Sequence, residues 1–336
     1  MQDPQVAISS EQLPRAQEVM HRMMARLRAA IVGRDDVIEL ISIALFADGH
    51  VLLEDYPGSG KTTLARALGQ GISRAERSSA FGAFRRIQFT PDLLPSDITG
   101  ASVFDPERSS LSFRPGPLFA HVVLADEINR TSPKVQSAML EAMAEKQVTV
   151  DNQTYPLDEL FFVIATQNPR DVAGTYPLPT PQLDRFLFCI RMKHISREAE
   201  LRVLARYPET SLQTAARLAQ VSREEILAVR KLLRESVFVS PAIQEGLVEL
   251  ATTLRSDARV VQGVSTRSLV LMLPALQARA LVHGRDFVSP DDVAVLSPFV
   301  FAHRLDCVPG IGDESQVVSE CLQPVLEMLA RTTLKR

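Results

Sequence analysis

Residues 54–63 are Glu-Asp-Tyr-Pro-Gly-Ser-Gly-Lys-Thr-Thr, and the interpretation of the whole chain starts from them. They follow the apolar run 50–53 and precede a stretch with helical spacing. Glycines allow a sharp bend and a close approach of backbone to an anion, and the N-terminus of the next helix adds its positive end. Lys61 can then reach the outer phosphates of a nucleotide, and the Thr62 hydroxyl can hold magnesium. The stretch therefore predicts a phosphate-binding loop, followed by a helix that begins near Thr62.

This loop departs from the usual pattern at one position. The usual pattern has a glycine five residues before Gly60, where this chain has Asp55. We expect the loop to tolerate the change, because the phosphate-contacting residues lie later. The tripeptide that ends the loop is common by itself, so the neighbouring motifs must decide its meaning. The loop residues predicted to bind the nucleotide are Pro57, Gly58, Ser59, Gly60, Lys61, Thr62 and Thr63.

Short apolar runs recur along the first 190 residues and alternate with helical or irregular stretches. Continuous apolar runs of this length are typical of strands buried on both faces, and their alternation with helices predicts a parallel sheet between helices. An amphipathic helix is predicted over 15–31 from its helical spacing of apolar residues, and another over 34–47. The five predicted strands are 50–53, 84–89, 121–125, 161–165 and 186–190.

After about residue 195 the pattern indicates helices alone. Three helix starts are marked by capping residues: Ser222 with Glu225, Ser240 before a proline, and Ser289 before a proline. We therefore predict an N-terminal helix in 1–30, an α/β domain over 31–195 and a small all-helical domain over 196–336.

A second acidic motif supports the loop. Residues 122–127 are Val-Val-Leu-Ala-Asp-Glu, a buried strand that ends in two carboxylates. Open α/β sheets carry their ligand sites at the C-terminal ends of the strands. Asp126 can there orient magnesium and its waters, and Glu127 can orient the attacking water or accept its proton. The alternative interpretation is an exposed acidic turn after a strand. It is less favoured because the predicted phosphate loop lies one strand earlier.

Two further polar positions flank the last predicted strands. Asn168 follows the strand 161–165 and can touch the terminal phosphate or the water, although Asn-Pro also begins turns. Arg185 lies in Leu-Asp-Arg-Phe before the fifth strand. Lone arginines are usually surface residues, but in an oligomer such an arginine can enter a neighbour's nucleotide site.

The charge and composition of the chain limit the kinds of partner that we expect. The net charge is −3, from 37 basic and 40 acidic side chains, which gives no general attraction to nucleic acid. Arg85-Arg86 and Arg108 with Arg114 are the candidate basic spots, although a solvated surface explains them better.

The three cysteines show no CxxC spacing and predict neither a disulfide framework nor a zinc site. No run approaches the roughly 18 apolar residues of a spanning helix, and residues 1–10 do not resemble a signal peptide. We expect a cytoplasmic protein without a membrane segment.

The order of these motifs resembles an AAA+ ATPase, and longer strings narrow the resemblance to the MoxR family. It covers about 31–305, nearly the whole chain. The strings are Gln88 to Asp97 (QFTPDLLPSD), Ala125 to Arg130 (ADEINR), Pro133 to Gln136 (PKVQ) and Ala165 to Phe186 (ATQNPRDVAGTYPLPTPQLDRF).

The resemblance implies roles at the matching positions. Lys61 and Thr62 match the Walker A loop, and Asp126 and Glu127 match Walker B. Residues 91–118 correspond to an insertion in helix 2, and 147–156 to a hairpin before sensor 1. The remaining matches are Asn168 with sensor 1, Arg185 with the arginine finger, Arg267 with sensor 2, and Ile31-Val32-Gly33-Arg34 with the segment bordering the adenine.

Members of this family use ATP and Mg²⁺. They typically form hexameric rings that remodel proteins, help complexes mature or help metal cofactors insert. They often work with proteins that carry a von Willebrand factor A domain. Pro274 lies about eight residues into the helix after Arg267, where a proline is expected to kink the helix and alter how Arg267 is aimed.

Two other functions stay open at this point. The chain could be an adaptor whose ATP hydrolysis only times the release of a partner, or a nucleic-acid motor, since AAA+ rings include both. The chain lacks an Asn-Lys-x-Asp segment for guanine, which argues against a GTP switch. Nothing in the two predicted insertions names a substrate.

Overall fold

A computed structural model describes residues 12–54, 59–73, 81–106, 109–168, 174–205 and 211–333. Its internal contacts divide the chain into two compact units. One unit spans Met23–Arg223, and the other joins Met1–Arg22 to Glu224–Arg336. The domain boundaries derived from the sequence stay a prediction.

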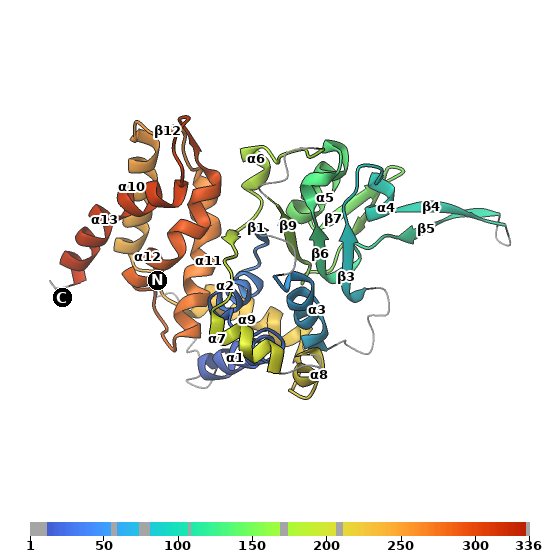
Figure 1. Cartoon of the computed structure of the whole chain (residues 1–336), viewed down its shortest axis with the longest axis horizontal. Helices are drawn as coiled ribbons and strands as arrows, with labels where there is room; N and C mark the ends of the chain where they lie inside the picture. The colour runs from blue at the N-terminus through green and yellow to red at the C-terminus, as the bar shows by residue number, and fades with distance from the viewer. Residues whose placement is uncertain are drawn as a thin grey trace, which may run out of the picture. The chain divides into compact units, whose positions relative to one another are not determined.

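A five-stranded parallel sheet forms the centre of the first unit, with the order β10-β1-β9-β6-β3 (Figure 1). β6 is buried along its whole length, as expected of a strand covered on both faces. This confirms the predicted fold class, although the last strand begins two residues later than predicted. The strands are β1 (Val51–Glu54), β3 (Gly82–Gln88), β6 (Ala120–Asp126), β9 (Phe162–Gln167) and β10 (Phe188–Arg191).

Helices and short elements complete this unit. Its core joins residues of β6 and β9 to the apolar face of α5, including Val123, Met139 and Val163. The strand pair β2 (Ile72–Ser73) and β11 (Val221–Ser222) is parallel. The helices are α1 (Gln12–Ala30, shared with the other unit), α2 (Asp35–Phe46), α3 (Lys61–Gly71), α4 (Pro95–Thr99), η1 (Ile128–Arg130), α5 (Pro133–Glu145), α6 (Thr180–Leu183), α7 (Arg197–Ala205) and α8 (Ser211–Ala216).

Two antiparallel hairpins leave the sheet. β4 (Gly100–Asp105) pairs with β5 (Ser110–Pro115) inside the predicted insertion, and β7 (Gln147–Val150) pairs with β8 (Gln153–Pro156). Figure 1 shows the β4–β5 ribbon standing away from the sheet. Phe104 and Leu111 are cross-strand partners on this ribbon, and both are exposed.

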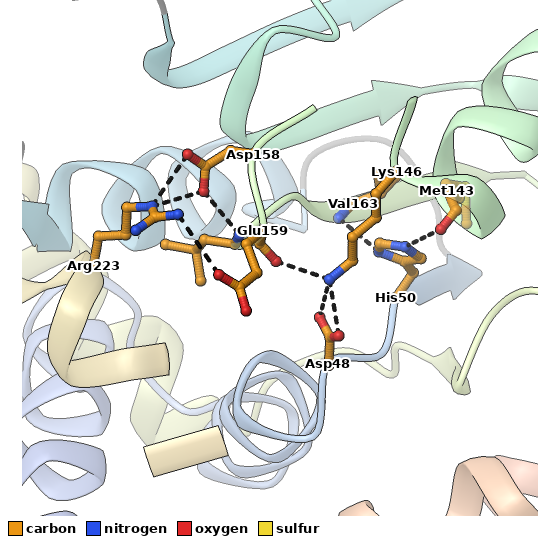
Figure 2. A network of polar contacts seen from close by, with 9 residues as sticks. Asp48, His50, Met143, Lys146, Asp158, Glu159, Val163 and Arg223 are labelled. Carbon is orange, nitrogen blue, oxygen red and sulfur yellow. Dashed lines mark hydrogen bonds and ion pairs between the residues drawn. The ribbon is translucent and has the colours of Figure 1, made fainter. Parts of the chain in front are cut away.

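A polar network fixes the base of the β7–β8 hairpin (Figure 2). Lys146 Nζ donates to both carboxylate oxygens of Asp48, at 2.7 and 2.8 Å, and to the Glu159 carbonyl at 2.8 Å. Nearby, His50 Nδ1 accepts from the Val163 N–H at 3.1 Å. The hairpin is thus tied to the residues that lead into β1.

The other unit is mainly helical. Ser240 Oγ accepts from the Ile243 N–H at 3.3 Å, and Ser289 forms a capping box with Asp292, so these two of the three predicted helix starts are confirmed. A helix also begins at Arg223, directly after the predicted start at Ser222. A small antiparallel ribbon of β12 (Val260–Gln262) and β13 (Asp306–Cys307) adds to the expected helices. The helices are α9 (Arg223–Ser236), α10 (Pro241–Ser256), α11 (Thr266–Val282), α12 (Pro290–Phe301), η2 (Ala302–Arg304) and α13 (Glu314–Thr333). In the part of the chain that the structure describes, no helix is long and apolar enough to cross a membrane.

Candidate functional site

The candidate site lies at the C-terminal ends of the parallel strands. Glu54, the last residue of β1, is the register partner of Gln167, the last residue of β9. Gln88 at the end of β3 is the partner of Asp126 at the end of β6. Four strands therefore end at one edge of the sheet, where ligands bind in open α/β folds.

The end of the predicted phosphate loop forms the start of α3. The helix begins at Lys61, and its N-cap residue is Gly60, which has a left-handed backbone (φ 92°). No side chain of the N-cap residue therefore occupies the first N–H groups of the helix. The first N–H groups of a helix lack partners within the helix, so they suit an anion. Thr62 and Thr63 are half-buried in the first turn. The predicted residues Pro57 and Gly58, and the departure at Asp55, fall outside the described residues.

A buried hydroxyl supports the nucleotide reading of this loop. Ser59 Oγ is buried and has no hydrogen-bond partner among the described residues. Buried polar groups are normally paired, and the position of this atom directly before the helix start is compatible with contact to a ligand oxygen. The donors of the helix start, the Thr62 hydroxyl and the Asp126 carboxylate are of the type that binds a magnesium nucleotide.

The segment predicted to border the adenine lies beside this loop. A Cβ atom added to Gly60 would be 3.8 Å from Ile31 Cδ1. Val32 is half-buried, and Gly33 has φ 73°. A Cβ added to Gly33 would be only 2.5 Å from the Ala199 Cβ, so this segment is packed closely on α7.

Asp126 is held from both neighbouring strands. Its Oδ1 accepts a hydrogen bond from Thr166 Oγ1 at 2.7 Å, and its Oδ2 accepts one from Arg86 Nη2 at 2.6 Å. Thr166 belongs to β9 and Arg86 to β3. The carboxylate therefore has one fixed orientation at the end of β6.

Glu127 leaves the strand through a left-handed turn, with φ 58°. Its N–H donates to Thr166 Oγ1 at 2.9 Å. Its Oε2 accepts from Gln88 Nε2 at 2.8 Å and lies 3.2 Å from Arg130 Nε. Positive φ is uncommon for residues other than glycine, and here it turns the carboxylate away from the strand direction.

Asn168 follows β9 directly and is half-buried. The residue before it, Gln167, donates from Nε2 to Glu54 Oε1 at 2.9 Å, while Arg191 Nε donates to Glu54 Oε2 at 3.0 Å. The structure thus brings together the strand before the phosphate loop, the acidic pair and Asn168.

Two further predicted arginines lie on other elements. Arg185 follows α6, and its Nη1 donates to the Leu140 carbonyl of α5 at 3.3 Å. Arg267 is an exposed residue of α11 in the other unit, and Pro274 lies inside the same helix. Their roles as arginine finger and sensor 2 stay predictions.

Three residues that contact the acidic pair were not predicted from the sequence, namely Thr166, Arg86 and Gln88. Arg86 was expected to be a solvated surface residue or part of a basic spot, but its guanidinium is paired with Asp126. The available signal was positional, because each residue lies at or near a strand end beside the acidic motif.

Comparisons with known proteins agree with this geometry. A family model described as the ATPase family associated with various cellular activities matches residues 50–188, and an AAA lid domain model matches 252–321. Chaperone MoxR1 of Mycobacterium tuberculosis is 37% identical over 299 residues, which are 85% of this chain and 75% of the relative. Protein MoxR of Methylorubrum extorquens is 31% identical over 330 residues, covering 91% and 93%.

Two other matches extend over nearly the full length. The uncharacterized protein YeaC of Bacillus subtilis is 42% identical over 328 residues, covering 95% of this chain and 99% of that protein. A crystal structure of a candidate ATPase from Cytophaga hutchinsonii superposes with a TM-score of 0.83 at 32% identity, covering 94% of this chain and 96% of that one.

Proposed function

The chain belongs to the MoxR family of AAA+ ATPases, and we propose that it hydrolyses ATP with magnesium to remodel protein complexes. The observation that carries the proposal is that Asp126 and Glu127 at the end of β6, and Asn168 after β9, lie at the edge of the sheet where β1 also ends. The next helix along the chain after β1, α3, begins at Lys61. Phosphoryl transfer depends mainly on positioning and on neutralising charge, and these groups supply both.

Each residue of the site has a proposed task. Lys61 and the N–H groups at the start of α3 neutralise the outer phosphates. Thr62 and Asp126 would hold magnesium, which supplies further positive charge to the phosphate oxygens. Glu127 orients the attacking water and accepts its proton, and Asn168 orients the same water or the terminal phosphate.

We propose that the active form is a ring of identical subunits, a hexamer as in relatives. Arg185 would then complete the site of the neighbouring subunit as an arginine finger. In the single chain its guanidinium contacts α5 rather than the edge of the sheet, which is consistent with a role outside its own site. Arg267 would act as sensor 2.

The proposed work of the ring is chaperone-like assistance to complex maturation or metal-cofactor insertion, with a von Willebrand factor A protein as a candidate partner. One relative is named a chaperone, and the exposed pair Phe104 and Leu111 on the β4–β5 ribbon offers apolar contact. The test is whether a purified partner protein is altered during ATP hydrolysis. If the partner is bound and released without being altered, the chain is an adaptor and not a remodelling ATPase.

Two variants test the hydrolysis itself. Lys61→Ala should lose most binding of a fluorescent ATP analogue, and Glu127→Gln should keep that binding while phosphate release falls by about a hundredfold or more. Normal hydrolysis by Glu127→Gln would remove Glu127 from its proposed role. Absence of hydrolysis in the unmodified chain with Mg²⁺ would refute the ATPase proposal.

A mixing experiment tests the shared site. Arg185→Ala subunits have a complete site but lack the finger, and Lys61→Ala subunits have the finger but no site. Each alone should be nearly inactive, and mixtures should regain a part of the activity that rises with the Lys61→Ala fraction and then falls. An active Arg185→Ala protein, or mixtures as inactive as the components, would contradict a finger acting across subunits.

A further inference from the structure

We propose that Thr166 is the positioning residue of this ATPase: one buried hydroxyl fixes both acidic residues of the site. Thr166 is fully buried on β9, and its Oγ1 contacts Asp126 and the backbone of Glu127 at once. The inference rests on the proposed function, because it assumes that these two residues serve hydrolysis.

The direction of the two hydrogen bonds is determined by chemistry. A backbone N–H can only donate, so Thr166 Oγ1 accepts from Glu127 N at 2.9 Å. The single hydroxyl hydrogen is then donated to Asp126 Oδ1 at 2.7 Å. A hydrogen bond to an ionised carboxylate is stronger than one between neutral groups, so the side chain has a defined preference for the charged Asp126.

The accepted bond also supports the turn at Glu127. That residue has φ 58° and ψ 50°, a left-handed conformation that L-residues rarely adopt. Without Thr166 Oγ1, the Glu127 N–H would lose its partner. The hydroxyl therefore helps to hold the backbone conformation in which Glu127 leaves the end of β6.

Thr166 supplies the buried side of the clamp on Asp126. On the other side, the Arg86 side chain is 46% exposed while it contacts Oδ2. A long, partly solvated side chain can change its conformation when a ligand arrives, whereas a buried β-branched side chain has little rotamer freedom. The Thr166 hydroxyl therefore sets the orientation of the Asp126 carboxylate. Binding of magnesium by Asp126 would depend on that orientation.

The test compares three variants in the full-length chain. Thr166→Val keeps the shape and removes the hydroxyl, and Thr166→Ser keeps the hydroxyl. Thr131→Val is the matched control, since Thr131 is equally buried and its Oγ1 has no hydrogen-bond partner within the described part of the chain. Phosphate release, affinity for a fluorescent ADP analogue without Mg²⁺, and the Mg²⁺ concentration that half-saturates analogue binding are measured for each.

We expect Thr166→Val to lower kcat by about tenfold to a hundredfold and to raise the half-saturating Mg²⁺ by about tenfold. Analogue affinity without Mg²⁺ should change little, because the phosphate loop is intact. Thr166→Ser should recover most of both properties, and Thr131→Val should match the unmodified chain. A role in folding alone would lower the melting temperature without moving the Mg²⁺ requirement.

Two results would overturn the inference. One is a Thr166→Val protein with normal turnover and a normal Mg²⁺ requirement. The other is a Thr166→Ser protein as impaired as Thr166→Val, which would assign the effect to packing. If Thr166→Val does not fold, Thr166→Cys replaces it, because a thiol is a weak donor. Failure of the ATPase proposal is distinguishable, since the unmodified chain and Thr131→Val would then be inactive as well.

Discussion

Gln88 donates a hydrogen bond to Glu127 across 2.8 Å, joining the end of β3 to the residue that follows β6. The same glutamine accepts from Arg86 Nη2 at 2.7 Å, and Arg86 in turn contacts Asp126. The two acidic residues are thus connected through β3. The carboxylate proposed to orient water thus accepts a hydrogen bond from a protein donor.

This contact predicts that Gln88 restrains basal hydrolysis. Gln88→Ala frees Glu127 Oε2 from one donor and leaves it more available to a water molecule. A hydrogen bond with a net strength of about 1 kcal/mol corresponds to an increase in turnover of about fivefold. Phosphate release at saturating ATP measures it, with exposed Gln262→Ala as the control. A lower rate would show instead that Gln88 holds Glu127 in its productive position.

The sheet was predictable because its strands are short apolar runs covered on both faces. β6 and β9 begin and end within two residues of their predicted limits. The acidic pair and Asn168 were recognisable because they follow such strands directly. Local sequence carries this information, since the end of a buried strand is visible as a change from apolar to polar residues.

The contacts around the acidic pair were not predictable in the same way. Gln88 meets Asp126 through the register of β3 on β6, and Thr166 meets it from β9. These partners are about 40 residues apart in the chain. A shift of register by one residue would turn each side chain to the other face. Arg86 therefore looked like a surface residue although its partner is Asp126.

Gly33 provides a prediction about the segment proposed to border the adenine. Gly33 and Gly174 have nearly the same φ, 73° and 72°. Among the residues that the structure describes, an added Cβ meets nothing within 4 Å at Gly174, whereas at Gly33 it would lie 2.5 Å from Ala199 Cβ. Gly174→Ala should cost about 1–2 kcal/mol of stability from backbone strain alone, and Gly33→Ala about 1–3 kcal/mol more from overpacking.

The two alanine variants also differ in function. Gly33→Ala should shift the segment containing Val32 and weaken binding of a fluorescent ATP analogue, and Gly174→Ala should not. Melting temperature and analogue affinity are measured together. Equal losses of stability in both variants would mean that α7 moves aside at little cost. Unchanged analogue affinity in Gly33→Ala would argue against contact between this segment and the nucleotide.

The ion pair between Arg223 and Asp158 predicts how stability depends on acid. Arg223 Nε donates to Asp158 Oδ1 at 2.8 Å, and the Asp158 side chain is only 7% exposed (Figure 2). His121 Nε2 lies 3.6 Å from the same carboxylate. Burial raises the pKa of Asp158, but the nearby His121 and the hydrogen bonds from the Leu160 N–H and Arg223 outweigh it and hold the pKa below its ordinary value.

A depressed pKa means that the folded chain favours the charged carboxylate. The resulting stabilisation is fully present above the unfolded pKa, about 3.9, and is lost as pH falls from there toward the lower folded pKa. Arg223→Ala leaves a buried charge with fewer partners and should lower the free energy of unfolding at pH 7 by about 3 kcal/mol. Arg28→Ala is the control, because the Arg28–Asp35 pair is 47% and 71% exposed and should contribute less than about 1 kcal/mol.

Urea unfolding followed by circular dichroism suits this comparison, since the chain contains no tryptophan. The difference between Arg223→Ala and the unmodified chain should be largest at pH 7 and should shrink as pH falls below about 4, because Asp158 of the variant, without the guanidinium, takes up a proton there and is no longer a buried charge. The difference for Arg28→Ala should stay small throughout. A loss in Arg223→Ala that is equal at pH 7 and pH 3 would assign the effect to the packing of the Arg223 side chain rather than to its charge.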